Sequence, residues 1–213
     1  MNREERTDGG ASNYLVYDFV KATAALPGLL WMRPKILYAS EAAREKLRGG
    51  VLLISNHAGF LDPVCLMIAI WYRRHHFVCL KEFYKGRVSR WLFTQFHCIP
   101  IDRENFSMES LRTITGELQR DHLVTMFPEG HVTSGEGLSP FKSGMVLLSM
   151  RSGKPLVPVY MRKRKHWYSR VVLGIGERVD VRAELGERPS QTAMNEMTAR
   201  LQKAEEELAK LVG

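Results

Sequence analysis

The sequence predicts an α/β fold: a three-layer sandwich with a mostly parallel central sheet, preceded by an amphipathic N-terminal helical segment. Three observations predict it. The chain has 213 residues, 45% of them hydrophobic, which suits one globular domain with its own core. From residue 51 onward, short apolar runs alternate with stretches of helical periodicity, as in a parallel sheet covered on both faces. Before residue 41 the chain shows a single helical pattern.

The N-terminal part divides into a polar leader and an amphipathic segment. Residues 1–12 are polar with mixed charge, so we expect a flexible leader rather than a signal peptide. In the segment 13–40, apolar residues recur at helical spacing from Leu15 to Leu26, where Pro27 is expected to end the helix. Charged residues interrupt this stretch too often for a membrane-spanning helix. Its aromatic and basic side chains suit a helix that lies on a bilayer surface, and packing on the core is the alternative.

The remainder, residues 41–213, carries the pattern of the sandwich. Strands are expected at the short apolar runs 51–54, 77–80, 99–101, 123–127, 156–159, 171–175 and 179–181. Helices are expected from 64 to about 72, at 111–118, at 144–150, and from a cap at Ser190 or Thr192 to 211. Sites in such sheets lie at the carboxyl ends of strands, so we expect the polar loops 55–62, 81–86 and 128–137 to be neighbours.

The net charge of the chain narrows the class of binding partner. Lys and Arg number 31 against 23 Asp and Glu, a formal charge of +8. We therefore expect an anionic partner: nucleic acid, an anionic bilayer or a phosphorylated small molecule.

Cys65, Cys79 and Cys98 are far apart in apolar surroundings, so we expect small buried hydrophobes in a reducing cytoplasm. Their spacing matches no zinc motif, and no metal site is predicted.

His57 and Asp62 are the first candidates for chemistry. They lie in a loop that leaves a buried strand and enters a helix, and the turn at Gly59 can bring the carboxylate back to the imidazole. An Asp that accepts from Nδ1–H fixes the tautomer and leaves Nε2 as a general base near neutral pH. The alternative is structural, because Asp62 followed by Pro63 is also an ordinary N-cap and first-turn pair. The two interpretations can coexist, since a carboxylate has two oxygens.

Other loops carry residues suited to an anionic substrate. Arg103 can pair with a phosphate through its planar fork, and Lys142 precedes a helix whose backbone N–H groups suit an anion. Glu129, next to Gly130, can accept from a substrate hydroxyl or brace a cationic side chain. Residues 162–170 mix positive charge with aromatics, which suits lipid headgroups or nucleic acid. Taken singly, each fits a solvated surface residue at least as well.

Four blocks of the sequence occur in a fixed order: NH(four residues)D at 56–62, IPIDR at 99–103, FPEG at 127–130 and VPVY at 157–160. In order and spacing they resemble the four blocks of the glycerolipid acyltransferase family, specifically the 1-acylglycerol-3-phosphate acyltransferases. Lys81-Glu82 and residues 141–144 resemble that family's connecting segments. The resemblance covers roughly residues 50–162 and makes 41–213 an acyltransferase domain and 13–40 its membrane-associating segment.

The resemblance implies roles for individual residues. His57 matches the family's catalytic base and Asp62 its partner, while Arg103 and Glu129-Gly130 match positions that hold the phosphorylated acceptor. Lys81 and Lys142 match the same task. His131-Val132 stands where the family commonly has Thr or Ser and then Arg, a departure that leaves the identity of the acceptor open.

The resemblance also implies a reaction and a place. An acyl group passes from acyl-CoA or acyl-carrier protein, as co-substrate, to the sn-2 hydroxyl of lysophosphatidate, giving phosphatidate for phospholipid synthesis. A thioester is already activated, so we expect direct transfer with no cofactor, no metal and no covalent enzyme intermediate. The implied partners are an anionic membrane surface, a lysophospholipid and the acyl donor, with no nucleic acid. The implied location is the cytoplasmic face of the cell membrane, where the enzyme is peripheral or monotopic.

Three alternatives stay open from the residues. The same chemistry can act on glycerol-3-phosphate, a lyso-amino-lipid or another lysophospholipid. A thioesterase would use the same base on water and release free acid. A non-catalytic protein that binds anionic membranes or nucleic acid would show salt-sensitive binding and no thioester consumption.

Overall fold

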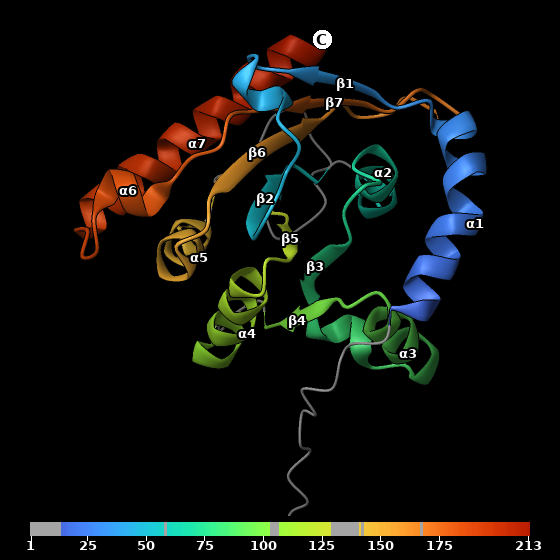
Figure 1. The fold of residues 1–213 in the computed structure, drawn as a ribbon, viewed down its shortest axis with the longest axis horizontal. Helices are drawn as coiled ribbons and strands as arrows, with labels where there is room; N and C mark the ends of the chain where they lie inside the picture. The colour runs from blue at the N-terminus through green and yellow to red at the C-terminus, as the bar shows by residue number, and fades with distance from the viewer. Residues whose placement is uncertain (1–13, 58, 103–106, 129–140, 142, 167) are drawn as a thin grey trace, which may run out of the picture.

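The computed structural model describes residues 14–57, 59–102, 107–128, 141, 143–166 and 168–213 (Figure 1). Within these residues, one seven-stranded sheet forms the middle of the molecule, in the order β1-β7-β6-β2-β5-β3-β4. Every neighbouring pair is parallel except β6 and β7, which are antiparallel. The strands are β1 Lys35–Tyr38, β2 Val51–Ser55, β3 His75–Leu80, β4 Ile99–Ile101, β5 Leu123–Met126, β6 Leu156–Met161 and β7 Val172–Ile175.

Helices cover both faces of the sheet, and the predicted three-layer sandwich is confirmed (Figure 1). Side chains alternate along β2: Val51 and Leu53 pack toward the helix that contains Leu66, and Leu52 and Ile54 pack on the opposite face. Strands buried on both faces explain the continuous apolar runs. The helices are α1 Leu15–Met32, α2 Asp62–Ala69, α3 Arg87–Gln95, α4 Met108–Gln119, α5 Gly144–Ser152, α6 Val181–Leu185 and α7 Gln191–Val212, with short 3-10 turns η1 Ala42–Arg44 and η2 Lys81–Tyr84.

The N-terminal helix is longer than predicted. It continues through Pro27 and ends at Met32, where Arg33 takes a left-handed conformation with φ 42°. Packing outweighs the proline here, because Met32 is buried and Gly28 approaches α2 so closely that a Cβ would lie 2.6 Å from Ile68 Cδ1. In the part of the chain that the structure describes, no helix combines the length and apolarity needed to cross a membrane.

Three local elements differ from the predictions. The first strand, β1, lies inside the segment 13–40 and pairs with β7, so that segment is not wholly helical. Helix α3 was not predicted. The predicted strand at 179–181 is wrong: Val179 forms only an isolated bridge with Leu156, and Val181 begins α6, whose Asp180 cap accepts from the Ala183 N–H. An N-cap Asp outweighs a short apolar run at this position.

Most of the other predicted elements appear at the predicted places. Strand β3 begins two residues earlier than expected, at His75, and Ser190 rather than Thr192 caps α7. Cys65 is buried as expected, whereas Cys79 and Cys98 are only partly buried. The leader 1–12 lies outside the described residues.

Candidate active site

The site forms where parallel strands end. His57 follows β2, Phe127 follows β5, and Arg162 follows β6, and β2 pairs with both of those neighbouring strands. Because the carboxyl ends of neighbouring parallel strands lie at the same end of the sheet, segments far apart in sequence meet there.

The carboxylate of Asp62 lies against the imidazole of His57, as the sequence predicts. His57 Nδ1 is 3.0 Å from Asp62 Oδ2, and the same oxygen accepts the backbone N–H of Gly59 at 2.7 Å. The Asp62 side chain is 8% exposed and that of His57 is 19% exposed. Asp62 is also the first residue of α2, followed by a proline at the second position. The N-cap interpretation of Asp62 is wrong, because Leu61 occupies the N-cap of α2 and no side chain caps this helix. Asp62 lies in the first turn and orients the histidine.

The ring of His57 is fixed from its face as well. It stacks on Phe127, with 4.2 Å between ring centroids and 19° between planes. The ring of Phe127 in turn lies parallel to that of Phe77 in β3, with 6.5 Å between ring centroids. With Nδ1 directed to Asp62 and one face on Phe127, the imidazole presents Nε2 for proton transfer.

Asn56 is a further residue of the site, and its role was not predicted from the sequence. Its buried side chain forms two hydrogen bonds with the backbone of Met161: Nδ2 donates to the carbonyl at 3.0 Å, and Oδ1 accepts the N–H at 2.7 Å. This pair joins the end of β2 to the end of β6 directly beside His57. The contact spans 105 positions, so local pattern could not reveal it.

The predicted acceptor-binding residues fall into two groups. Arg103, Glu129, Gly130 and Lys142 lie outside the described residues. Lys81 is described: it is exposed and begins η2, which follows β3. Among the contacts of the described residues, no hydrogen bond or ion pair joins Lys81 to His57.

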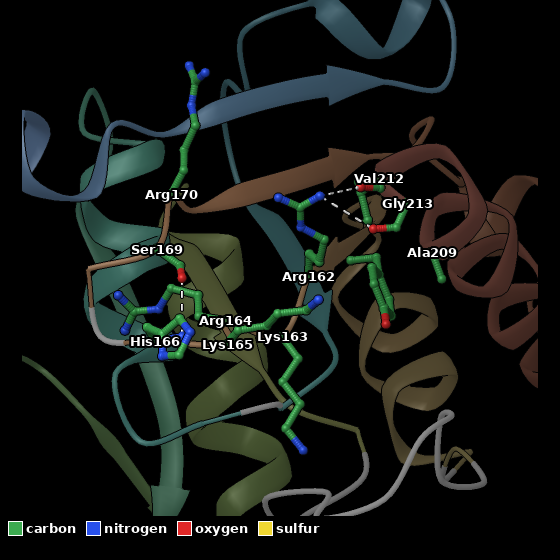
Figure 2. A pocket seen from close by; sticks show the side chains of 11 residues that line it. Arg162, Lys163, Arg164, Lys165, His166, Ser169, Arg170, Ala209, Val212 and Gly213 are labelled. Atoms are coloured by element: carbon green, nitrogen blue, oxygen red, sulfur yellow. Dashed lines mark hydrogen bonds between the residues drawn. The ribbon is translucent and has the colours of Figure 1, made fainter.

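The basic stretch 162–170 lies at the same edge of the sheet. It lines a hollow of about 580 Å³, shown in Figure 2, and Arg162 and Arg164 also line a smaller hollow of about 260 Å³ together with Gly59 and Asp62. Two of its cations have structural partners. Arg162 Nη1 donates to the Val212 carbonyl at 3.3 Å, drawn as a dashed line in Figure 2, and Arg170 Nε donates to the carbonyl of Arg33 at 2.6 Å.

A mostly parallel sheet with a His–Asp pair at the carboxyl ends of its strands is an arrangement that can support base catalysis. Residues 36–162, more than half of the chain, match the family model described as Acyltransferase. The chain therefore belongs to the acyltransferase family and is an acyltransferase. The family resemblance inferred from the four sequence blocks is confirmed.

Three proteins that are similar to this chain share one name. The 1-acyl-sn-glycerol-3-phosphate acyltransferase of Bacillus subtilis (strain 168) is 27% identical over 164 residues, which span 75% of this chain and 81% of that protein. The enzyme of the same name from Streptococcus pneumoniae is 24% identical, over 73% and 61% of the two chains. One from Limnanthes alba is 33% identical over 126 residues, 55% of this chain and 42% of that protein.

The fold also has a solved counterpart. The crystal structure of the 1-acyl-sn-glycerophosphate (LPA) acyltransferase PlsC from Thermotoga maritima matches with a TM-score of 0.66. The match covers 92% of this chain and 79% of that one, at 16% sequence identity. It confirms the predicted α/β architecture.

Proposed function

We propose that this acyltransferase moves a fatty acyl group from an acyl thioester, acyl-CoA or acyl-carrier protein, to the sn-2 hydroxyl of lysophosphatidate. The product is phosphatidate. The observation that carries the proposal is the His57–Asp62 pair, held at 3.0 Å at the carboxyl edge of the sheet, within a family match that spans it. The names of the similar bacterial and plant enzymes support lysophosphatidate as the acceptor.

The chemistry follows from the geometry. Nε2 of His57 takes the proton of the acceptor hydroxyl as its oxygen attacks the thioester carbonyl carbon. A tetrahedral intermediate forms, the C–S bond breaks, and the imidazolium returns the proton to the leaving thiolate. Such a base contributes roughly 10²–10⁴-fold in rate, and holding both substrates together contributes more. Asp62, through Nδ1, stabilises the imidazolium while it exists.

The acceptor phosphate requires cations near His57. We assign the cationic contacts to Arg103, Lys81 and Lys142, and a supporting role in holding the acceptor to Glu129-Gly130, on the strength of the family blocks that they match. The formal charge of +8 and the basic stretch 162–170 at the same edge add a positive field that attracts anionic substrates.

Lysophosphatidate lies in a bilayer, so the enzyme must reach one. Helix α1 exposes Leu15, Phe19, Leu26 and Leu30, each by 66% or more, and α3 exposes Trp91. Helices α1, α2 and α3 lie toward the same side of the view in Figure 1. Large exposed apolar side chains flanked by basic residues are typical of helices that lie in a membrane interface. We propose peripheral or monotopic attachment to the anionic cytoplasmic face of the membrane.

A mass-spectrometric transfer assay tests the reaction. Purified protein is given lysophosphatidate, or a glycerolipid acceptor without phosphate, with acyl-CoA or acyl-carrier protein as donor. We expect phosphatidate from the wild type, little product without the acceptor phosphate, and loss of roughly 10²–10⁴-fold in His57→Ala. The control is Gln119→Ala, which removes an exposed side chain at the end of α4, far from the basic stretch and from His57. Turnover by His57→Ala within a few-fold of the wild type, or equal use of both acceptors, would contradict the proposal.

Vesicle co-sedimentation tests the membrane partner. We expect the wild type to bind vesicles that contain anionic lipid, and Phe19→Glu with Leu26→Glu to weaken that binding at least tenfold. Leu211→Glu, at an exposed site on α7, serves as the control for adding a charge elsewhere. Equal binding by all three proteins would overturn the assignment of α1 as the membrane contact.

A further inference from the structure

A second cluster of titratable side chains lies at the amino ends of the strands, the opposite end of the sheet from His57. His76 stands near the start of β3, Glu117 is on α4, and His122 directly precedes β5. Glu117 Oε2 is 2.6 Å from His122 Nδ1 and 3.5 Å from His76 Nδ1. The three elements are separate in sequence and converge on one carboxylate oxygen.

The cluster is enclosed but reachable. The His76 side chain is 4% exposed, that of Glu117 19% and that of His122 30%, so one histidine is buried and the other borders solvent. The two imidazole rings stack with 4.3 Å between centroids and 16° between planes, which brings corresponding nitrogens to the same side.

We propose that His76, Glu117 and His122 form a binding site for a divalent transition-metal ion of the Zn²⁺ type. One ligand atom from each residue lies within 4.8 Å of the other two. In a tetrahedral site with bonds near 2.0–2.2 Å, ligand atoms are about 3.3 Å apart, so only modest side-chain adjustments bring all three onto one ion. Two imidazoles and one carboxylate, with a further position for water, are a ligand set that suits zinc.

The neighbours of the cluster support metal binding by orienting the ligands. Tyr14 Oη is 3.1 Å from His76 Nε2, so the phenol oxygen can accept a hydrogen bond from Nε2–H, the tautomer that leaves the Nδ1 lone pair for the metal. Arg120 Nη1 donates to Glu117 Oε1 at 2.7 Å, which leaves Oε2 directed at both histidines. In the metal-free protein the proton on His122 Nδ1 occupies the place of the ion, and metal binding transfers it to Nε2 or to solvent.

The site has a structural consequence. A metal here joins α4 to β3 and β5, and through Tyr14 it extends to the start of α1. Tyr14 also packs on His97, with 4.1 Å between ring centroids. Because the cluster lies at the amino ends of the strands, metal binding stabilises the fold without entering the transfer reaction. The sequence predicted no metal site, since these residues match no local ligand spacing.

Metal titration of the untagged, full-length protein tests this site. After chelator treatment and dialysis, Zn²⁺ is added in competition with a chromogenic chelator, and Co²⁺ is added as a spectroscopic probe. We expect one equivalent of Zn²⁺ per chain, the visible absorption of tetrahedral Co²⁺, and a thermal midpoint several degrees higher with Zn²⁺.

Variants locate the ion. We expect at least a 100-fold loss of Zn²⁺ affinity in His122→Ala and a clear loss in the isosteric Glu117→Gln, with circular dichroism confirming that both are folded. His57→Ala and His166→Ala, which remove histidines at the other edge, should bind Zn²⁺ as the wild type does. No stoichiometric binding by folded wild type, or unchanged affinity in both cluster variants, would overturn the proposal.

Discussion

His57 and Asp62 are joined by a 3.0 Å hydrogen bond that links the end of β2 to the first turn of α2. The oxygen that faces the imidazole also accepts the Gly59 N–H. One carboxylate therefore positions both the turn at Gly59 and the histidine, and because it belongs to α2, any movement of α2 moves the proposed base.

Asp62→Asn should lower kcat by roughly 10- to 1000-fold and leave KM nearly unchanged, because the amide keeps the shape but no longer stabilises an imidazolium. Initial rates of phosphatidate formation measure it. The double variant with His57→Ala should be no slower than His57→Ala alone, since the two side chains act as one unit. Asp180→Asn, which keeps a capping side chain on α6, is the control. Independent, multiplicative losses in the double variant would show that Asp62 does not act through His57.

Phe127 offers a test of how the imidazole is positioned. Its ring stacks on His57 at 4.2 Å, so Phe127→Ala leaves that face of the imidazole unsupported. We expect kcat to fall about tenfold, because small errors in the placement of a catalytic group are costly in rate. Phe127→Leu, which keeps apolar bulk at the same place, should recover most of the activity. Equal rates for wild type and Phe127→Ala would mean that Asp62 alone positions the ring.

Asn56→Ala should lower the free energy of unfolding by about 2–3 kcal/mol, because it leaves the buried N–H and C=O of Met161 without their side-chain partner. Urea unfolding measures the change. Activity should fall as well, since β2 and β6 are no longer joined beside His57. Asn195→Ala removes an exposed amide from α7 and should change stability by less than about 0.5 kcal/mol. Similar losses in both variants would contradict a special role for the Asn56–Met161 pair.

The sequence pattern predicted the strands and helices whose own residues are buried. The run at β2 is apolar at four consecutive positions because both faces of that strand are covered, and such runs are visible in any sequence. The edge strand β1 was missed: its apolar run, residues 36–38, is shorter than that of β2, and the strand is only partly buried. Helix α3 was missed although Val88, Trp91 and Leu92 stand at helical spacing in the sequence, and the structure leaves this apolar stripe exposed rather than packed on the core.

The candidate site was predictable only where its residues are close in sequence. His57 and Asp62 are five positions apart, and the loop between them suggested their contact. Asn56 meets Met161, and His76 meets His122, across long stretches of chain that only the sheet topology brings together. Tertiary contacts of this kind are decided by strand order, and one sequence does not reveal strand order.

Gly50, directly before strand β2, has no room for an added methyl group. A Cβ there would lie 2.0 Å from the backbone carbonyl oxygen of Leu118, so the end of α4 would have to move. The Gly50 N–H also donates to Asp121 Oδ1 at 3.1 Å, and this bond would be strained by the same movement. We expect Gly50→Ala to lower the free energy of unfolding by about 1–3 kcal/mol.

Gly144→Ala is the matched control, because Gly144 begins α5 and a Cβ there would meet nothing within 4 Å. This substitution should leave stability unchanged or raise it by up to about 1 kcal/mol, since alanine restricts the unfolded chain and favours a helix. Urea unfolding of both variants gives the comparison. Equal effects at the two glycines would show that the close approach of Gly50 to Leu118 does not limit what this position accepts.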